Sequence, residues 1–384
     1  MKSVSSEYAR DTTALGITFI AGFLWCFSAS AQPAPPSAQS APPQTAPQAT
    51  SQTAPAQSQE AWEATMSRTP VPKKGCFESS FPNTEWQEVA CTTALPRPYP
   101  PARGSRPEIV GNGIDWTASV TDTTISWAHG SFDSVTGVTS ETDSRTGNSD
   151  TFSLQLNSEF FATSASPCQG APNHTCTGWQ QFLFSTSGCT NSTACVFMQY
   201  WLLNYGPTCP SGWNQYGLDC FFNSNSTSVP MQTIAQLRWL RLTGMANSGG
   251  MDTVVLSTED RRHLYRAENQ DNVLDLAQHW QVVEFNIFGD CCLSQANFNN
   301  GSTLAVRTRV IDGAAIAPTC VQQGFTGETN NLTLVGTPAI AQVEAPAAIV
   351  FTESNATGGT PASCASCNAD VGFLVSLIFH LLNR

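Results

Sequence analysis

The part of the chain between Ile109 and Val335 consists of short apolar or alternating runs, such as "TFSLQLN" and "QVVEFNIFG", separated by clusters of Gly, Asn, Ser and Thr. Many short strands at near-regular spacing, with polar turns between them, are typical of a β-sandwich or β-barrel. Only residues 272–281 have a helix-like period, and they fit a loop leading into a strand equally well. The predicted fold class is therefore all-β.

Composition agrees with a large core and argues against some partners. The chain has 384 residues, 41% hydrophobic and 12% charged, with a formal net charge of −12. Its surface must therefore consist mainly of uncharged polar groups. Because an acidic chain without a basic patch repels phosphates, we expect no nucleic-acid partner. The sequence contains no phosphate-binding Gly-rich loop, and we expect no cofactor.

Residues 1–31 have the pattern of an export signal. Lys2 and Arg10 precede an apolar stretch at residues 14–27, and Ala29-Ser30-Ala31 follows it. The apolar stretch is shorter than the roughly 20 residues that a spanning helix needs, so we expect no stable membrane span. The predicted location is secreted, either extracellular or periplasmic.

The cysteines point to the same oxidising compartment. The chain has 14 Cys, and local disulfides explain the spacing of most of them. The predicted pairs are Cys76/Cys91, Cys168/Cys176, Cys189/Cys195, Cys209/Cys220 and Cys364/Cys367, while Cys291, Cys292 and Cys320 compete for one another. No His is placed to complete a zinc site with these thiols, so no metal site is predicted.

Composition also divides the chain into segments. Residues 32–60 are rich in Pro, Ala and Gln and are predicted to be a disordered linker. Residues 61–106 form a lead-in closed by the Cys76/Cys91 pair, and residues 107–335 form the β-sandwich. Residues 336–384 are predicted to be a linker followed by an apolar C-terminal segment that is too short to span a bilayer.

Polar side chains inside the predicted strands are the main functional signal. Successive side chains of a strand point to opposite faces of its sheet, so parity assigns each position to a face. If the strands are neighbours in one curved sheet, their amides and one carboxylate converge on a concave face rich in Trp and Tyr. The residues predicted there are Gln155, Gln180 or Gln181, Gln199, Trp201, Glu284 and Asn286.

Such a face suits an extended polymer, because amides and carboxylates pair equally well with sugar hydroxyls and with a peptide backbone. The alternative is that the polar side chains are only solvated, since an antiparallel sheet often leaves one face in water.

The order of four sequence blocks resembles that of the glutamic peptidases (eqolisins). These blocks are "GWQQFLFS", "FMQYWLLNYG", "QVVEFNIFGD" and "SQANF", within residues 116–310. The resemblance implies a concanavalin-A-like, jelly-roll type of antiparallel sandwich. It also implies that Gln181, or Gln180 in the other alignment, and Glu284 are catalytic. A second alignment places Glu284 at the family's first, non-catalytic glutamate and Phe288 at the catalytic position.

In the chemistry that the resemblance implies, a glutamate carboxylate activates water as general base and the Gln amide stabilises the oxyanion. Three functions therefore follow from the sequence. The first is the binding of a glycan or peptide on the amide-lined face, and the second is an acid endopeptidase built on Gln181 and Glu284. The third is a non-catalytic structural surface protein.

Overall fold

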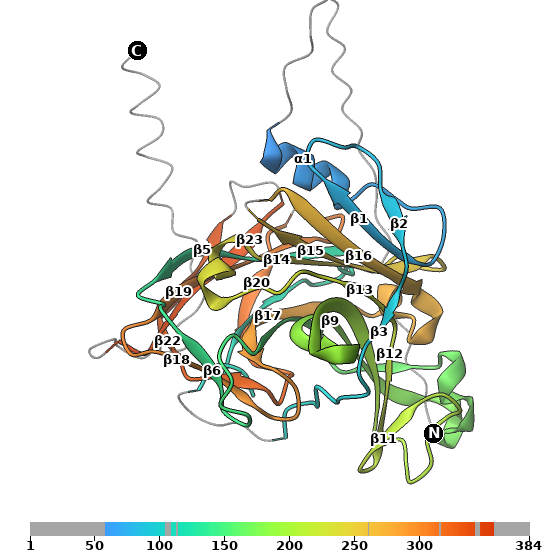
Figure 1. Ribbon diagram of the computed structural model, residues 1–384. Helices are drawn as coiled ribbons and strands as arrows, with labels where there is room; N and C mark the ends of the chain where they lie inside the picture. Colours follow the sequence, from blue (N-terminus) through green and yellow to red (C-terminus); the bar gives the residue numbers. More distant parts are fainter. Residues whose placement is uncertain are drawn as a thin grey trace, which may run out of the picture. The chain divides into compact units, whose positions relative to one another are not determined.

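The computed structural model describes residues 58–103, 109–112, 114–259, 261–314, 316–341 and 346–356. The predicted export signal, nearly all of the predicted linker at 32–60, the apolar C-terminal segment and the Cys364/Cys367 pair lie outside the described residues. The described chain is all-β, as predicted, with two large antiparallel sheets packed face to face as a sandwich (Figure 1).

The first sheet has nine strands and contains the first and the last strand of the described chain. In spatial order its strands are β2 (Gln87–Val89), β1 (Cys76–Ser80), β16 (His263–Gln270), β15 (Met251–Thr258), β14 (Arg241–Met245), β5 (Trp127–Thr136), β19 (Thr303–Ile311), β23 (Ala348–Ser354) and β22 (Thr333–Ala341). Burial alternates strictly along β19, as expected for a strand with one face in the core and the other toward solvent.

The second sheet has eleven strands and carries the predicted site residues. Its main path is β11 (Asn214–Tyr216), β12 (Asp219–Asn223), β10 (Thr193–Leu203), β9 (Cys176–Cys189), β7 (Phe152–Ser158), β17 (Val282–Gly289), β4 (Trp116–Ser119) and β20 (Thr319–Gln322). The short strands β13 (Asn225–Ser228), β3 (Thr92–Thr93) and β8 (Phe161–Thr163) attach to this path at β10, β13 and β9. Burial is nearly continuous along β7, β9, β10 and β17, so both faces of this sheet are covered.

Smaller elements complete the described chain. A three-stranded sheet consists of β21 (Thr329–Asn330), β18 (Gln295–Phe298) and β6 (Glu141–Asp143). The one α-helix among the described residues is α1 (Gln59–Met66), and short 3-10 helices are η1 (Ser166–Gly170), η2 (Pro172–His174), η3 (Thr190–Ser192), η4 (Ile234–Trp239), η5 (Asp271–Val273) and η6 (Leu276–Gln278). The segment with a helix-like period, 272–281, thus contains only isolated helical turns. No helix in the described ranges has the length and apolar character required to cross a membrane.

The main core lies between the two large sheets. Phe182 and Phe285 of the second sheet are fully buried in it. Each ring lies against a glycine of the first sheet: a methyl group added at Gly130 would lie 2.0 Å from a ring carbon of Phe285, and one at Gly244 would lie 2.6 Å from Phe182. The two glycines therefore allow the sheets to approach closely around these rings.

The lead-in segment is part of the sandwich. Strand β1 pairs with β16 at the edge of the nine-stranded sheet, with Cys76 opposite Ala267. Helix α1 precedes it and buries Trp62 and Met66 in a cluster with Trp127 and Met245, which lie on the outer face of the same sheet. The lead-in therefore contributes to the main fold at an edge and on a face.

Strands β22 and β23 continue the nine-stranded sheet beyond residue 335, where the sequence predicted the sandwich to end. The register shifts between Val335 and Ala339, and Gly336 there has a positive φ of 71°. This irregularity, together with Pro338, breaks the alternation of apolar and polar residues by which a strand is recognised in a sequence.

Disulfides connect residues that are close in the sequence. The structure contains the four predicted bridges Cys76–Cys91, Cys168–Cys176, Cys189–Cys195 and Cys209–Cys220. A fifth bridge joins the adjacent residues Cys291 and Cys292. Of the three cysteines predicted to compete, these two are therefore the pair.

Candidate functional site

Most of the predicted residues lie together on the outer face of the eleven-stranded sheet, on the four neighbouring strands β10, β9, β7 and β17. Strand β12 adds Asn223 to them. Asn223 of β12 pairs with Gln199 of β10, and Gln199 pairs with Gln181 of β9. Asn157 of β7 lies between Gln181 and Glu284 of β17 and pairs with both. These five side chains form one line across five strands, which we call the amide row.

Gln155, Trp201 and Asn286 lie beside this row on the same face, because each is two positions from a row member on its own strand. The Gln181 amide donates to Gln155 Oε1 over 3.0 Å. The Trp201 indole N–H lies 3.0 Å from Gln181 Oε1 and 2.9 Å from Gln199 Oε1. Gln155, Gln181, Gln199 and Trp201 thus belong to one hydrogen-bonded network, which Asn157 extends to Glu284. The Asn286 amide instead donates to Asp115 and Glu353.

Gln180 does not belong to this network. It follows Trp179 on β9 and points to the opposite face, where its amide donates to Asp252 Oδ2 over 2.8 Å. Because adjacent side chains of a strand alternate between faces, only one of the two glutamines can lie on the row. The structure places Gln181 there, and the prediction that Gln180 lines the same face is corrected.

The face is not solvated. Gln155, Gln181, Gln199, Glu284 and Asn286 all have 0% of their surface exposed. The alternative in which the polar residues merely face water is therefore wrong for these positions. Two other parts of the chain cover them: residues 95–101, which we call the strap, and residues 325–330.

The strap is an extended segment with the sequence "LPRPYPP", and its backbone is held group by group. The Gln199 amide donates to the Arg97 carbonyl over 2.9 Å, and its Oε1 accepts the Tyr99 N–H over 2.8 Å. The Pro98 carbonyl accepts the Cys292 N–H over 3.0 Å, and the Pro100 carbonyl accepts the Gly327 N–H over 2.7 Å. One side chain of the row thus binds two backbone groups of the strap.

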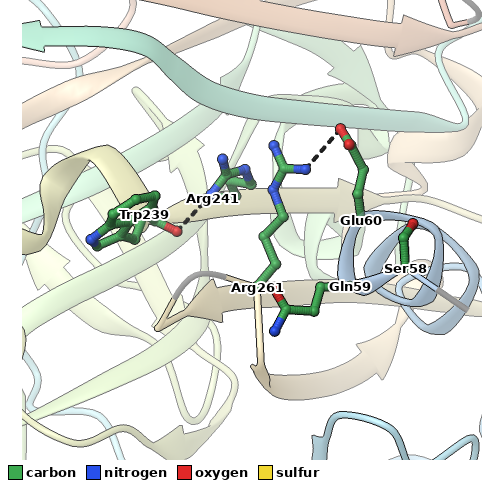
Figure 2. Close-up of a pocket in the computed structure, with 6 residues that line it drawn as sticks. All are labelled: Ser58, Gln59, Glu60, Trp239, Arg241 and Arg261. Carbon is green, nitrogen blue, oxygen red and sulfur yellow. Dashed lines mark hydrogen bonds and ion pairs between the residues drawn. The ribbon is translucent and has the colours of Figure 1, made fainter. Parts of the chain in front are cut away.

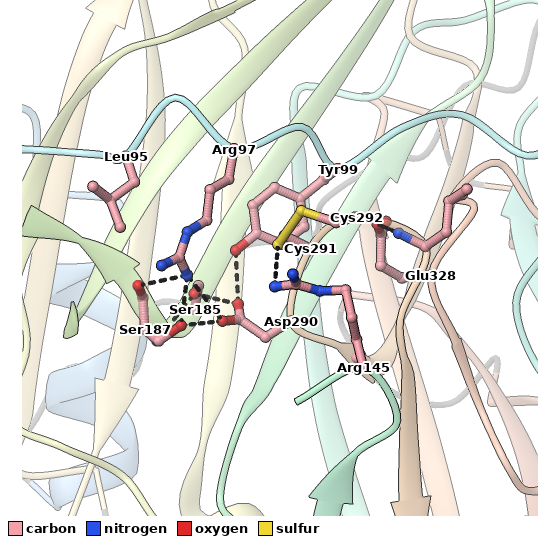
Figure 3. Close-up of a disulfide and its surroundings, with 12 residues drawn as sticks. Leu95, Arg97, Tyr99, Arg145, Ser185, Ser187, Asp290, Cys291, Cys292 and Glu328 are labelled. Carbon is pink, nitrogen blue, oxygen red and sulfur yellow. Dashed lines mark hydrogen bonds and ion pairs between the residues drawn. A yellow bond between two sulfur atoms is a disulfide. The ribbon is translucent and has the colours of Figure 1, made fainter. Parts of the chain in front are cut away.

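The side chains of the strap are also anchored, as Figure 3 shows. The Tyr99 ring packs against Phe197, and its hydroxyl donates to Asp290 Oδ1 over 2.8 Å. Asp290 is 2% exposed and also accepts hydrogen bonds from the hydroxyls of Ser185 and Ser187. The buried carboxylate therefore has several partners, as a buried charge requires.

The turn that contacts the strap contains the Cys291–Cys292 bridge (Figure 3). Cys291, Cys292 and Leu293 have positive φ angles of 66°, 62° and 66°, a left-handed conformation that non-glycine residues rarely adopt. Non-glycine residues keep such backbone angles only where surrounding contacts fix them. Here the Leu293 N–H donates to Glu328 Oε1 over 2.9 Å, and the Cys292 N–H binds the strap.

Residues 325–330 cover the other end of the row. The Phe325 N–H donates to Glu284 Oε2 over 3.1 Å, and the Asn157 amide donates to the same oxygen over 2.9 Å. Glu284 Oε1 and Asn157 Oδ1 are buried and have no hydrogen-bond partner among the described residues. Unpaired buried acceptors of this kind are rare in proteins and mark this end of the row as a place for further polar contacts.

Burial dominates the acid–base properties of this region. Burial raises the pKa of Glu284 to about 7, partly offset by hydrogen bonds from Asn157 and Phe325. It raises the pKa of Glu328 to about 8, with the Thr326 hydroxyl opposing the shift. Burial likewise raises the pKa of Glu353, which accepts the Asn286 amide over 2.9 Å, to about 8. These carboxyls hold protons at pH values where exposed carboxyls are ionised.

The geometry bears directly on the predicted dyad. Gln181 and Glu284 share a face, but β7 lies between their strands, and at ordinary strand spacing this places their backbones about 10 Å apart. The Asn157 side chain lies in register between them. A substrate group that contacts both the Gln181 and the Glu284 side chains would therefore have to occupy the position of the Asn157 side chain.

Sequence reasoning missed the strap, Asp290 and Glu328. Parity places Asn157 on the same face as Gln155, but Asn157 was not among the predicted site residues. The strap contains Pro at four positions, 96, 98, 100 and 101, a pattern that signals an extended segment but not where it binds. In the described part of the chain, no group of three or more His, Cys, Asp and Glu side chains is arranged to hold a metal ion.

Comparison with known proteins gives no relative: no family model, curated protein or solved structure matches the chain.

Proposed function

We propose that the outer face of the eleven-stranded sheet is a binding face for extended, proline-rich polypeptide, and that the strap is its intramolecular occupant. The observation that carries this proposal is the pairing of the Gln199 side-chain amide with both the Arg97 carbonyl and the Tyr99 N–H. The side-chain amide thus donates to one peptide unit and accepts from the next, so that it binds the backbone on both sides of Pro98.

The composition of the strap supports this proposal. Proline has no N–H, so a proline-rich segment presents few donors that need a partner. It also loses little conformational entropy on binding, and aromatic-lined grooves commonly bind such segments. On this face Phe197 contacts Tyr99, and a buried cluster of Trp179, Trp201, Phe221 and Phe325 lies at one side of the row.

The proposed setting is an exported protein. The five disulfides among the described residues favour an oxidising compartment, since such bridges are rare in reducing cytosol. The resemblance to glutamic peptidases supports a concanavalin-A-like arrangement of the sandwich as part of the same proposal.

Binding of a separate peptide tests this function. The probe is a fluorescent peptide "LPRPYPPA", which copies residues 95–102, and the control is a peptide of the same composition in scrambled order. The tethered strap competes at an effective concentration in the millimolar range, so we expect weak binding to the unmodified protein. Tyr99→Ala removes the strap's aromatic anchor, and we expect the probe to bind this variant at least about ten-fold more tightly.

Gln199→Leu in the Tyr99→Ala background should abolish binding of the probe, because the backbone contacts are lost. Near-ultraviolet circular dichroism establishes that each variant is folded. Equal binding of the probe and the scrambled peptide, or no binding to a folded Tyr99→Ala variant, would show that the strap is only structural. Binding of oligosaccharides on a glycan array, without peptide binding, would favour the glycan alternative.

A second candidate function is peptide hydrolysis by Glu284, with Gln181 or Asn157 stabilising the oxyanion. The raised pKa of Glu284, which accepts a backbone N–H from Phe325 on the same face, favours it. A carboxyl with a pKa of about 7 is protonated in acid, so it can act as a general base only near or above pH 7. This argues for activity that rises toward neutral pH, in contrast to the acid endopeptidase that the resemblance implies.

Incubation with denatured casein from pH 4 to pH 9 tests hydrolysis. We expect cleavage to increase through about pH 7 and to disappear in Glu284→Gln. The control is Glu85→Gln, an exposed residue far from the row in the sequence. The absence of cleavage by the parent protein, or equal cleavage by parent and Glu284→Gln, excludes this second function.

A further inference from the structure

Six asparagines of the chain are followed two positions later by Ser or Thr, with a residue other than proline between: Asn173, Asn191, Asn225, Asn300, Asn331 and Asn355. The motif Asn-x-Ser/Thr is the acceptor for N-linked glycans in proteins that enter a eukaryotic secretory pathway. The structure divides the six asparagines into two groups by the surroundings of their side chains.

The first group has exposed side chains and consists of Asn173, Asn191, Asn225 and Asn300. In the described part of the chain, none of these four side-chain amides has a hydrogen-bond partner. Asn173 and Asn191 have positive φ angles of 59° and 65°, a turn conformation that asparagine tolerates better than most other residues. The Nδ2 atoms of this group are therefore open to substitution.

These four asparagines lie at turns and at the start of a short strand. Asn191 lies between β9 and β10, and Asn300 lies between β18 and β19. Asn173 lies in η2, before β9, and Asn225 begins β13 opposite Thr93 of β3 (Figure 1). None of the four belongs to the amide row or to the strap. Exposed turns of this kind accept added bulk without a change in the core.

The second group, Asn331 and Asn355, is half-buried and its side chains are hydrogen-bonded. Asn331 Nδ2 donates to the Phe298 carbonyl over 2.9 Å, and Asn331 Oδ1 accepts the Phe298 N–H over 2.9 Å. Asn355 Nδ2 donates to the carbonyls of Phe298 and Asn299 over 3.3 Å and 3.1 Å. A glycosidic bond replaces one of the two amide hydrogens, and Asn355 uses both.

The exposed asparagines also lie outside the hollows of the surface. Figure 2 shows a cavity of about 300 Å³ that is lined by the start of α1 and by Trp239, Arg241 and Arg261. Neither this cavity nor the adjoining one of about 330 Å³ is lined by an asparagine of the six. A branched sugar attached at the four exposed positions is therefore not confined by the walls of either cavity.

From this division we propose that Asn173, Asn191, Asn225 and Asn300 carry N-linked glycans and that Asn331 and Asn355 do not. The proposal rests on the exported setting proposed above. The co-substrate is a lipid-linked diphospho-oligosaccharide. A bond forms between the asparagine Nδ2 and the sugar C1, the bond from C1 to the diphosphate oxygen breaks, and one amide proton passes to the released lipid diphosphate.

Glycans are attached as the chain enters the pathway, so the fold decides which modified chains can mature. A chain modified at Asn355 loses a hydrogen bond between β23 and the turn after β18, whereas a chain modified at Asn191 loses none. The folded, secreted protein should therefore carry glycans at the first group alone.

Production of the full chain in a eukaryotic host that secretes proteins tests the proposal. Enzymatic release of glycans in heavy-oxygen water converts each glycosylated asparagine to labelled aspartate, which mass spectrometry locates. We expect the label at the four exposed positions and unmodified asparagine at the other two. Equal labelling of both groups would overturn the proposed division.

Two failures are distinguishable. A secreted, disulfide-bonded protein without label would overturn the glycosylation and leave the exported setting intact. A protein that stays in the cytosol with reduced cysteines would overturn the exported setting and this proposal together. Binding of the strap peptide is measured separately and does not depend on either result.

Single substitutions assign the glycans to positions. Asn191→Asp keeps a residue that tolerates the turn and removes the acceptor amide, so the secreted protein should lose the mass of one glycan. Asn225→Gln should do the same on β13. The matched control is Asn247→Gln, because Asn247 is also exposed but is followed by Ser248 and Gly249 and lacks the motif. A secreted Asn191→Asp or Asn225→Gln variant with the same glycan mass as the parent would exclude a glycan at that position.

Discussion

Gln199→Leu is the substitution that most directly tests how the strap is held. Leu is similar in size to Gln but neither donates nor accepts hydrogen bonds. The substitution leaves two backbone groups of the strap, the part-buried Arg97 carbonyl and the buried Tyr99 N–H, without the partner that each has in the structure. Asn223 and Trp201 retain their hydrogen bonds to the Leu95 carbonyl and to Gln181.

Each buried polar group left unpaired costs about 1–3 kcal/mol, so the two backbone groups together cost about 2–6 kcal/mol. Water that enters beneath a loosened strap lowers this cost, and we expect a loss of about 2–4 kcal/mol in the free energy of unfolding. Urea denaturation followed by tryptophan fluorescence measures the loss. Hydrogen exchange at the Tyr99 amide should accelerate by a larger factor than exchange in β15 or β16, because only the strap is released locally.

The control is Gln281→Leu, an exposed glutamine whose amide makes only a 3.4 Å contact to the Thr123 carbonyl. We expect its effect to lie within about 0.5 kcal/mol. A loss below about 1 kcal/mol in Gln199→Leu, with unchanged exchange at Tyr99, would refute the view that this side chain fixes the strap.

Three further results are expected. First, burial raises the pKa of Glu328 to about 8 from an ordinary 4.5, so the folded state binds this proton more tightly than the unfolded state does. The free energy of unfolding should therefore be greatest below about pH 4.5 and fall as the pH rises to about 8, by up to about 1.4 kcal/mol per pH unit for each such group. Glu328→Gln should flatten the dependence of the melting temperature on pH. Second, replacing Cys209 and Cys220 with Ser should lower the free energy of unfolding by about 2–4 kcal/mol in urea denaturation, and an unchanged value would argue against this bridge. Third, Gly130→Ala should cost about 1–3 kcal/mol or more, because the added methyl group collides with Phe285, and full stability in a thermal melt would contradict the close approach of the sheets.

The sequence predicted those features that depend on local pattern. Alternation assigns each polar residue to a face of its own strand, and the assumption that the strands are neighbours in one sheet then predicts Gln155, Gln199 and Glu284 on a common face, where the structure has them. Disulfides between nearby cysteines, such as Cys189–Cys195, were predictable because short loops constrain their own ends.

The features that sequence reasoning missed depend on contacts between distant residues. Tyr99 meets Gln199 a hundred positions along the chain, and no local pattern records that the strap covers this face. The pattern of polar residues in the strands is the same whether their face is solvated or covered by another segment. Helix α1 escaped notice because only Trp62 and Met66 among its apolar residues anchor it, one turn apart, in an otherwise polar stretch.

The route of residues 76–103 limits how this protein can be shortened for expression. Strand β1 occupies the hydrogen-bonding edge of β16, and the strap, a few residues later, covers the outer face of the opposite sheet. A recombinant fragment that starts at residue 107 would expose both the unpaired edge of β16 and the amide row, which the strap covers in the whole protein. Open strand edges of this kind promote aggregation. A minimal crystallisable fragment therefore has to start before Cys76.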